Sequence, residues 1–206
     1  MKKALIRYWL KSGLVKDKKI IDAFKKIKRE DFVLNEKEAY LDIALPILKG
    51  QTISQPSTIV IMLEALELKK GDKVLEVGAG SGYNASLIAE IIKPGIVYTT
   101  EIIKELCDYT KKNLKKAGIK NVKMFNVDGS KGLDKYKHFD KIIITAACPR
   151  LPENLIKQLK VNGILVAPVD KGYCQEMLKV IKRRNKLDIK NLGDFVFVKL
   201  KGEFGY

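Results

Sequence analysis

The chain has 206 residues, of which 46% are hydrophobic and 31% are charged, and its formal net charge is +16 at pH 7. This composition predicts a soluble globular protein with one sizeable core, and it excludes disordered and fibrous classes. No run of residues is apolar enough to span a membrane, and no cleavage site follows the basic, partly apolar residues 1–6, so we expect a cytoplasmic protein with no membrane partner.

The reactive side chains exclude several kinds of chemistry. Cys107, Cys148 and Cys174 are too scattered for a disulfide framework or a CxxC metal site, and we expect no metal. His138 is the only histidine, so the reaction must proceed without a histidine base. The basic excess is mostly lysine spread along helices, and arginine, the preferred phosphate reader, is scarce. We therefore do not expect a nucleic-acid partner.

The first third of the chain is predicted to be mainly helical. Residues 1–34 have apolar side chains at helical spacing, residues 35–53 have no such period, and Pro46 indicates an extended stretch. A further helix is predicted from Pro56, because a proline suits a first helical turn. We interpret residues 1–68 as a helical and substrate-binding extension of a single domain that spans residues 1–206.

A strand–helix alternation follows, in residues 69–206. Strands are predicted at 73–77, 97–100, 122–126, 139–145, 164–166, 176–183 and 195–200. Helices are predicted after the glycine loop through about residue 92, from about 104 to 116, and at 153–159. Such an alternation with a terminal hairpin predicts an α/β fold. We expect a doubly wound, mostly parallel, Rossmann-like sheet of seven strands with an antiparallel C-terminal edge, and these residues as its cofactor-binding core.

A glycine-rich loop comes directly after the first predicted strand of this sheet, with Gly78, Gly80 and Gly82 at alternate positions. A dinucleotide-binding loop would have its third glycine at position 83, where Tyr83 stands. Glycines let the backbone approach a ligand closely, and free amides at a helix start suit a carboxylate. The loop favours S-adenosylmethionine as the cofactor.

Acidic residues near the ends of the predicted strands support this cofactor. Glu101 ends the second strand, where a carboxylate accepts hydrogen bonds from unphosphorylated ribose hydroxyls and disfavours NADP. Asp128 and Gly129 follow the third strand, where the carboxylate is placed for an adenine amino group; an ordinary Asp-Gly turn is the alternative. Glu76 either steadies the loop or holds the cofactor's ammonium group. Together these residues predict an S-adenosylmethionine-dependent methyltransferase.

The methyl acceptor has to be read from other segments. Methylation of a base amino group commonly uses an Asp/Asn-Pro-Pro-aromatic run after the fourth strand, but residues 145–149 are Thr-Ala-Ala-Cys-Pro. Cytosine C5 methylation needs an activated cysteine, and nothing near Cys148 obviously lowers its pKa. A carboxylate acceptor is already ionised at neutral pH and needs only desolvation and alignment. The sequence thus favours a carboxylate over a base.

A more specific resemblance extends over nearly the whole chain. Residues 50–56 (GQTISQP) are similar to the substrate motif of the protein-L-isoaspartate (D-aspartate) O-methyltransferase family, and residues 74–84 (VLEVGAGSGYN) resemble its cofactor motif. Further similar segments are 29–33, 39–40, 128–129, 140–149, 155–168 and 202–206. The chain departs from the family pattern at Leu48-Lys49 and at Val127.

The resemblance implies methyl transfer from S-adenosylmethionine to the free α-carboxylate of L-isoaspartyl residues in damaged proteins and peptides, which starts their repair through a succinimide. Ser54 matches the active-site serine and would hold and orient the carboxylate. The implied substrate pocket also includes Thr52, Ile53, Ala147 and Cys148. The implied cofactor-binding residues are Glu76, Gly78, Gly80, Gly82, Tyr83, Asn84, Glu101, Asp128 and Gly129.

Other interpretations remain open beside the resemblance. Without the family match, a helix N-cap is the simpler role for Thr52 and Ser54. The charge of +16 also fits a tRNA or rRNA methyltransferase, whose binding would fall steeply with salt. A non-catalytic basic binding module is a third hypothesis, which the intact cofactor positions oppose. In all cases we expect a monomer.

Overall fold

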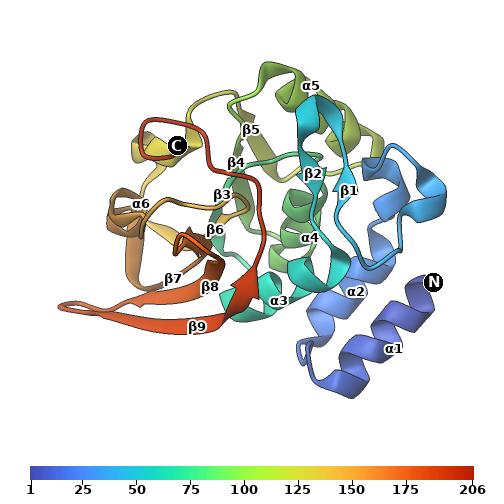
Figure 1. Cartoon of the computed structure of the whole chain (residues 1–206), viewed down its shortest axis with the longest axis horizontal. Helices are drawn as coiled ribbons and strands as arrows, with labels where there is room; N and C mark the ends of the chain where they lie inside the picture. Colours follow the sequence, from blue (N-terminus) through green and yellow to red (C-terminus); the bar gives the residue numbers. More distant parts are fainter.

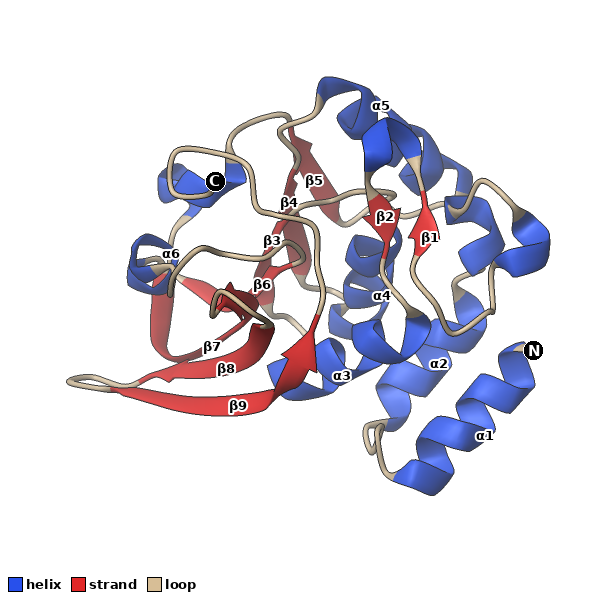
Figure 2. Cartoon of the chain, in the orientation of Figure 1, coloured by secondary structure: helices blue, strands red, loops and turns tan.

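A seven-stranded sheet forms the centre of the protein, with helices on both of its faces (Figure 1; Figure 2). The computed structural model describes residues 1–206, and the strand order is β5-β4-β3-β6-β7-β8-β9. Neighbours from β5 to β7 run parallel, and β8 and β9 pair antiparallel at one edge. The strands are β3 (Lys73–Val77), β4 (Ile96–Thr100), β5 (Val122–Phe125), β6 (Phe139–Ile144), β7 (Leu159–Asp170), β8 (Gln175–Lys182) and β9 (Leu187–Phe195). The predicted doubly wound sheet with an antiparallel C-terminal edge is confirmed.

Helices precede the sheet and connect its strands. They are α1 (Lys2–Ser12), α2 (Lys18–Lys26), α3 (Pro56–Leu66), α4 (Tyr83–Ile92), α5 (Lys104–Lys116) and α6 (Glu153–Lys157). Short 3-10 helices are η1 (Arg29–Phe32), η2 (Glu36–Glu38), η3 (Leu48–Gly50), η4 (Gly129–Lys131) and η5 (Asp134–Tyr136), and β1 (Leu45–Pro46) pairs with β2 (Thr52–Ile53). None of these helices combines the length and the apolar character that crossing a membrane requires.

The side chains of β3 alternate between two apolar cores, one on each face of the sheet, as the strand pleat requires. Val74 belongs to the core on the side of α3 and α4, and Leu75 and Val77 to the core on the side of α6. Because both faces are covered, the strand is apolar almost throughout. Glu76 is the exception: it is fully buried, on the same face as Val74.

The N-terminal helices share a core with the sheet. Trp9 and Phe24 pack edge to face with ring centroids 4.7 Å apart, in the same cluster as Tyr83 and Ile143. Trp9 Nε1 also donates a hydrogen bond to Ser57 Oγ in α3 at 2.7 Å. This packing joins the N-terminal extension to the sheet core, with the segment between β2 and α3 at their junction.

Two strands differ from prediction by more than a single residue at each end. The fifth strand is expected at 164–166, but β7 runs over twelve residues. Its first part, around Lys160, is exposed, so this part of the strand lacks the apolar side chains by which a buried strand is recognised in the sequence. The strand expected at 195–200 is wrong: β9 ends at Phe195, and beyond it only an isolated bridge joins Ala147 to Lys199. As an exposed edge strand, β9 carries many charged side chains, which weakens its apolar signal.

Candidate functional site

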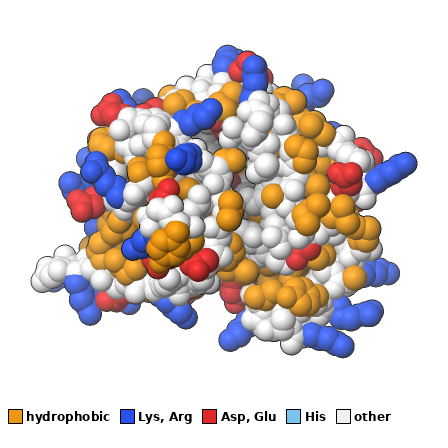
Figure 3. All heavy atoms as spheres, viewed as in Figure 1, with side chains coloured by type: hydrophobic (Ala, Val, Ile, Leu, Met, Phe, Trp, Pro, Cys, Tyr) orange, Lys and Arg blue, Asp and Glu red, His pale blue; other side chains and the backbone are white.

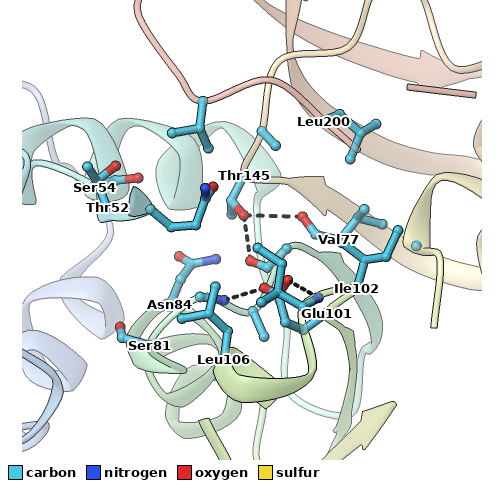
Figure 4. Close-up of a pocket in the computed structure, with 18 of the residues that line it drawn as sticks. Thr52, Ser54, Val77, Ser81, Asn84, Glu101, Ile102, Leu106, Thr145 and Leu200 are labelled. Atoms are coloured by element: carbon cyan, nitrogen blue, oxygen red, sulfur yellow. Dashed lines mark hydrogen bonds between the residues drawn. The ribbon is translucent and has the colours of Figure 1, made fainter. Parts of the chain in front are cut away.

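A cavity opens at the carboxyl ends of β3, β4 and β6 (Figure 4). The chain leaves β3 toward β4 and β5 on one side, whereas β6 and β7 lie on the other, so this is the point where the strand order reverses. Ligands of doubly wound sheets bind at such a point. The cavity has an empty volume of about 880 Å³, open solvent at its mouth included.

The glycine loop after β3 forms one wall of this cavity. Backbone N–H groups of Gly78 and Ala79 both donate to the Thr100 carbonyl at 3.0 Å, which fixes the loop against β4. Gly78 has a φ of 95°, and a Cβ there would lie 2.5 Å from Thr145 Oγ1. That hydroxyl instead donates to the Gly78 carbonyl at 2.5 Å (Figure 4). A glycine is therefore required at position 78 by conformation and by the close approach of β6.

Glu101 lies at the end of β4, in the wall of the cavity and almost fully buried. One carboxylate oxygen accepts from Gly80 N at 3.1 Å, and the other accepts from Ile103 N at 3.0 Å. These backbone donors hold the carboxylate in place. Because each carboxylate oxygen has more than one acceptor site, Glu101 keeps capacity for two further donors. A ribose diol is a ligand that supplies such a pair.

Asn84, in the first turn of α4, lines the same cavity. Its Nδ2 donates to Glu76 Oε1 at 2.8 Å, and its Oδ1 is buried without a hydrogen-bond partner. Glu76 also accepts from Thr99 Oγ1. Burial raises the pKa of Glu76 to about 7, although the hydrogen bonds from Thr99 and Asn84 favour its ionised form. The orphaned Asn84 oxygen suits an ammonium group, and it fits the amino-acid portion of S-adenosylmethionine.

On the opposite side of the cavity from Glu101 lie Thr52 and Ser54 (Figure 4). They also line a second cavity, with an empty volume of about 1360 Å³, whose wall includes Thr145 and Val198 as well. Thr52, Ser54, Thr145 and Val198 are thus common to both cavities. Ser54 therefore lies between the two cavities and lines both of them.

Ser54 does not cap helix α3, which was the alternative role for this residue. The N-cap residue of α3 is Gln55, and no side-chain hydrogen bond caps the helix. Ser54 is half-buried and its carbonyl accepts from Arg29 Nη2 at 2.7 Å. The hydroxyl is therefore not committed to the helix, and it remains available to a ligand.

Several predicted site residues lie outside the cavity walls. Tyr83 is buried against Phe32 and Arg29 instead of facing the cavity. Ala147 hydrogen-bonds through its backbone to Val198 and Leu200. Glu76, Gly82 and Cys148 are also not among the lining residues, and burial raises the pKa of the Cys148 thiol to about 12.

Asp128 is also outside the cavity walls, although Gly129 lines them. Its carboxylate accepts from Ser130 N at 2.9 Å and Ser130 Oγ at 2.6 Å, as in an Asx turn. It further accepts from Glu203 N at 2.8 Å. In this structure the carboxylate fastens the C-terminal segment to η4.

Sequence reasoning missed the C-terminal part of the cavity wall. The residues involved are Val198, Lys199, Leu200 and Lys201, on a segment that crosses the carboxyl ends of the strands after β9 (Figure 1). Hydrogen bonds from Leu200 N to Ala147 O and from Ala147 N to Val198 O hold it there. Thr145 was missed as well, although its position at the end of a strand was a usable signal. No group of three or more His, Cys, Asp or Glu side chains is placed to hold a metal ion.

Comparison with known proteins identifies one family. The model of the protein-L-isoaspartate(D-aspartate) O-methyltransferase family matches residues 1–204. A protein-L-isoaspartate O-methyltransferase of Pyrococcus horikoshii is 48% identical over 198 residues, which are 94% of this chain and 90% of that protein. One of Ignicoccus hospitalis is 48% identical over 204 residues, covering 97% of this chain and 96% of the relative.

Solved structures agree with this result. A protein-L-isoaspartate O-methyltransferase structure superimposes with a TM-score of 0.90 at 29% identity, over 100% of this chain and 67% of that chain. A second, from Plasmodium falciparum, is a complex with S-adenosyl-L-homocysteine. It has a TM-score of 0.87 at 26% identity and covers 97% of both chains.

Proposed function

Since the chain belongs to the protein-L-isoaspartate(D-aspartate) O-methyltransferase family and is an S-adenosylmethionine-dependent enzyme that methylates isoaspartyl residues, we propose that its two adjoining cavities divide this reaction. The first cavity takes the cofactor and the second takes the damaged chain. The single observation that carries this proposal is the wall the two cavities share, which contains Thr52 and Ser54.

The cofactor side rests on three groups of the chain. Glu101 accepts the ribose hydroxyls, Asn84 Oδ1 accepts from the ammonium group, and the loop from Gly78 to Gly80 lies against the rest of the ligand. Glu76 steadies Asn84 from behind the loop. Gly82, Tyr83 and Asp128 then support the site from outside its walls. When bound, S-adenosylmethionine supplies an electrophilic methyl group.

The acceptor side needs orientation and the exclusion of water. An α-carboxylate is ionised at neutral pH, so no base has to remove a proton. Ser54 donates its hydroxyl hydrogen to one carboxylate oxygen, and the other oxygen faces the cofactor directly, where the two cavities adjoin. Ile53 is buried beneath this segment, and Val198 and Leu200 cover the cavity from the C-terminal side. These apolar groups exclude the water that would solvate the carboxylate.

The second cavity is open enough for a polypeptide segment. The space-filling view is hollowed along its middle, with hydrophobic side chains on both sides (Figure 3). At the rim of this cavity, Tyr173 is 91% exposed and Val196 is 93% exposed. With the partly buried Phe195 and Phe197 of the same lining they gather apolar surface beside the cavity, and contiguous apolar patches mark contact surfaces. They support binding of the residues that flank the isoaspartyl site.

Repair then follows from the chemistry of the methylated chain. The ester product has a better leaving group than the carboxylate: a neighbouring backbone nitrogen attacks the ester carbonyl, the bond to the methoxy group breaks, and a succinimide forms with release of methanol. Hydrolysis of that ring yields normal aspartate in part of the molecules. The enzyme needs only to release the ester, and neither cavity requires a group for ring closure.

The working form of the enzyme is a further part of this proposal. A monomer stays the expected form. The three cysteines are free, which fits a reducing compartment such as the cytoplasm. Many lysines pair with acids, for example Lys26 with Glu90 and Lys116 with Asp31, and this supports a solvated surface over a nucleic-acid site.

Replacing Ser54 by Ala tests the assignment. We expect turnover of an isoaspartyl peptide to fall by roughly tenfold or more, because the carboxylate loses an orienting donor. Cofactor affinity, measured by calorimetry, should stay within a factor of about two, since Ser54 faces the cofactor only across the cavity. An equal loss of cofactor affinity would make Ser54 a structural residue and contradict the proposal. A matched aspartyl peptide serves as the substrate control.

A further inference from the structure

Arg29 is a buried arginine that no part of the reaction described so far uses. It begins η1, and none of its side chain is exposed. Nη2 donates to the Ser54 carbonyl at 2.7 Å, whereas Nε and Nη1 are buried without any hydrogen-bond partner. A buried guanidinium with two unsatisfied nitrogens is costly and calls for an explanation.

The surroundings of Arg29 do not neutralise its charge. The guanidinium carbon lies 5.0 Å from the centre of the Tyr83 ring, whose hydroxyl is also buried without a partner. Asp42 is an acidic neighbour, but its two carboxylate oxygens accept from Ser57 N and Ser57 Oγ. Glu30 accepts from the Tyr40 hydroxyl. Arg29 therefore keeps a positive charge without an ion pair.

This charge lies directly behind the proposed acceptor site. Ser54 lines both cavities, and Arg29 holds its backbone from the side away from them. The substrate of the reaction is a carboxylate, and a buried positive charge attracts an anion strongly because little water screens it. Burial lowers the pKa of Arg29 to about 10, which still leaves the group charged at neutral pH.

We propose that Arg29 is a positioning residue for the methyl acceptor: its unpaired guanidinium holds the Ser54 carbonyl and attracts the isoaspartyl α-carboxylate toward the Ser54 hydroxyl. The inference rests on the proposed placement of the acceptor at Ser54. Arg29 would thus make the enzyme prefer a carboxylate over a neutral group, although Arg29 does not line either cavity. The contact with Tyr83 also links this charge to the start of α4, next to Asn84 of the cofactor side.

The test compares Arg29→Met and Arg29→Lys with the original enzyme. Binding is measured for an isoaspartyl peptide and for the same peptide with a carboxamide in place of the α-carboxylate, both with S-adenosylhomocysteine present. We expect Arg29→Met to reduce the preference for the carboxylate by on the order of tenfold, with carboxamide binding unchanged. Arg29→Lys keeps the charge and should retain most of the preference. KM for the isoaspartyl peptide should rise more than kcat falls.

Folding and overall charge are controlled separately. Replacing an unpaired buried charge by an apolar group of similar size is often neutral for stability, so Arg29→Met should unfold within a few degrees of the original protein. Arg184, exposed between β8 and β9, gives the control Arg184→Met, which removes the same charge. An equal loss of preference in both variants would overturn the proposal.

Two further outcomes would also count against Arg29. The proposal fails if Arg29→Met weakens both peptides equally, because the residue would then hold only the shape of the site. It fails as well if neither peptide is affected. A failure of the Ser54 assignment is recognised independently, because Ser54→Ala would then leave turnover unchanged.

Discussion

Asn84 Nδ2 donates a hydrogen bond to Glu76 Oε1 at 2.8 Å, and this contact joins the first turn of α4 to the interior of β3. Because the nitrogen faces a carboxylate, the Asn84 oxygen is left as a buried acceptor in a residue that lines the cofactor cavity. Glu76 therefore influences the cavity without lining it.

Replacing Asn84 by Ala should weaken binding of S-adenosylmethionine by roughly tenfold to a hundredfold, the value of a hydrogen bond to a charged group. Calorimetry with the purified enzyme measures this. Asn121 offers a matched control, since its Oδ1 is also buried and unpartnered while its Nδ2 bonds to Ala89 O and Gly95 O. Asn121→Ala should lose stability but keep cofactor affinity. Similar affinity losses in both variants would refute the role of Asn84.

Replacing Glu76 by Gln should change how stability depends on pH. The pKa of Glu76 is raised to about 7 from an ordinary 4.5, so the folded protein binds a proton that the unfolded chain releases between these values. Glu76 thus favours folding fully below pH 4.5, and this contribution is lost as pH rises through 7.

The neutral Gln cannot show this loss. We therefore compare the free energies of unfolding of Glu76→Gln and the original protein, measured in denaturant at pH 5 and pH 8. Relative to the original protein, the variant should be more stable at pH 8 than at pH 5, by at most about 3 kcal/mol. A constant difference between the two proteins at both pH values would contradict a raised pKa.

Replacing Gly202 by Ala should loosen the C-terminal segment. Gly202 has a φ of 134°, and a Cβ there would collide with the Asp128 carboxylate and with Ser130 Oγ. Displacement would pull Val198–Lys201 from the cofactor cavity, so we expect cofactor affinity to fall by about tenfold and hydrogen exchange of this segment to rise. Gly172→Ala is the control, because Gly172 has a φ of 89° but nothing within 4 Å of its Cβ position. Gly172→Ala should lower stability through backbone strain alone and leave cofactor affinity unchanged.

Replacing Ser57 by Ala should destabilise the joint between α1 and α3. Ser57 Oγ accepts from Trp9 Nε1 at 2.7 Å and donates to Asp42 Oδ2 at 2.6 Å. The variant leaves a buried indole N–H without a partner, at a cost of about 1–3 kcal/mol in the free energy of unfolding. Ser12→Ala, at an exposed hydroxyl that bonds only to carbonyls of its own helix, should cost much less. Denaturant titration distinguishes the two.

The parallel part of the fold could be predicted from the sequence because its signals are local. The strand at 73–77 and the helix at 104–116 have the predicted bounds, since burial of both faces makes β3 apolar and a regular period marks α5. The C-terminal edge was less readable. Residues 195–200 (FVFVKL) are mostly apolar and suggest a strand, but beyond Phe195 they line the cavities instead of extending a ladder.

In the site, too, local motifs predicted some residues correctly, whereas the roles of others depend on contacts between distant parts of the chain. Glu101 and Ser54 follow motifs, and the structure brings both to the cavity. Asp128 fits the motif equally well, but its carboxylate is used by Ser130 and Glu203, a contact 75 residues away in the sequence. Arg29 is the clearest case of what a motif cannot convey. Its importance depends on the absence of an ion pair, and only the packed structure reveals its missing partners.

The wall of Thr52, Ser54, Thr145 and Val198 that both cavities share has a kinetic consequence. Donor and acceptor can occupy the protein together and meet face to face, so no methylated enzyme has to form between them. The kinetics should therefore be sequential, with intersecting double-reciprocal plots. A chiral methyl group should undergo one inversion of configuration in each turnover.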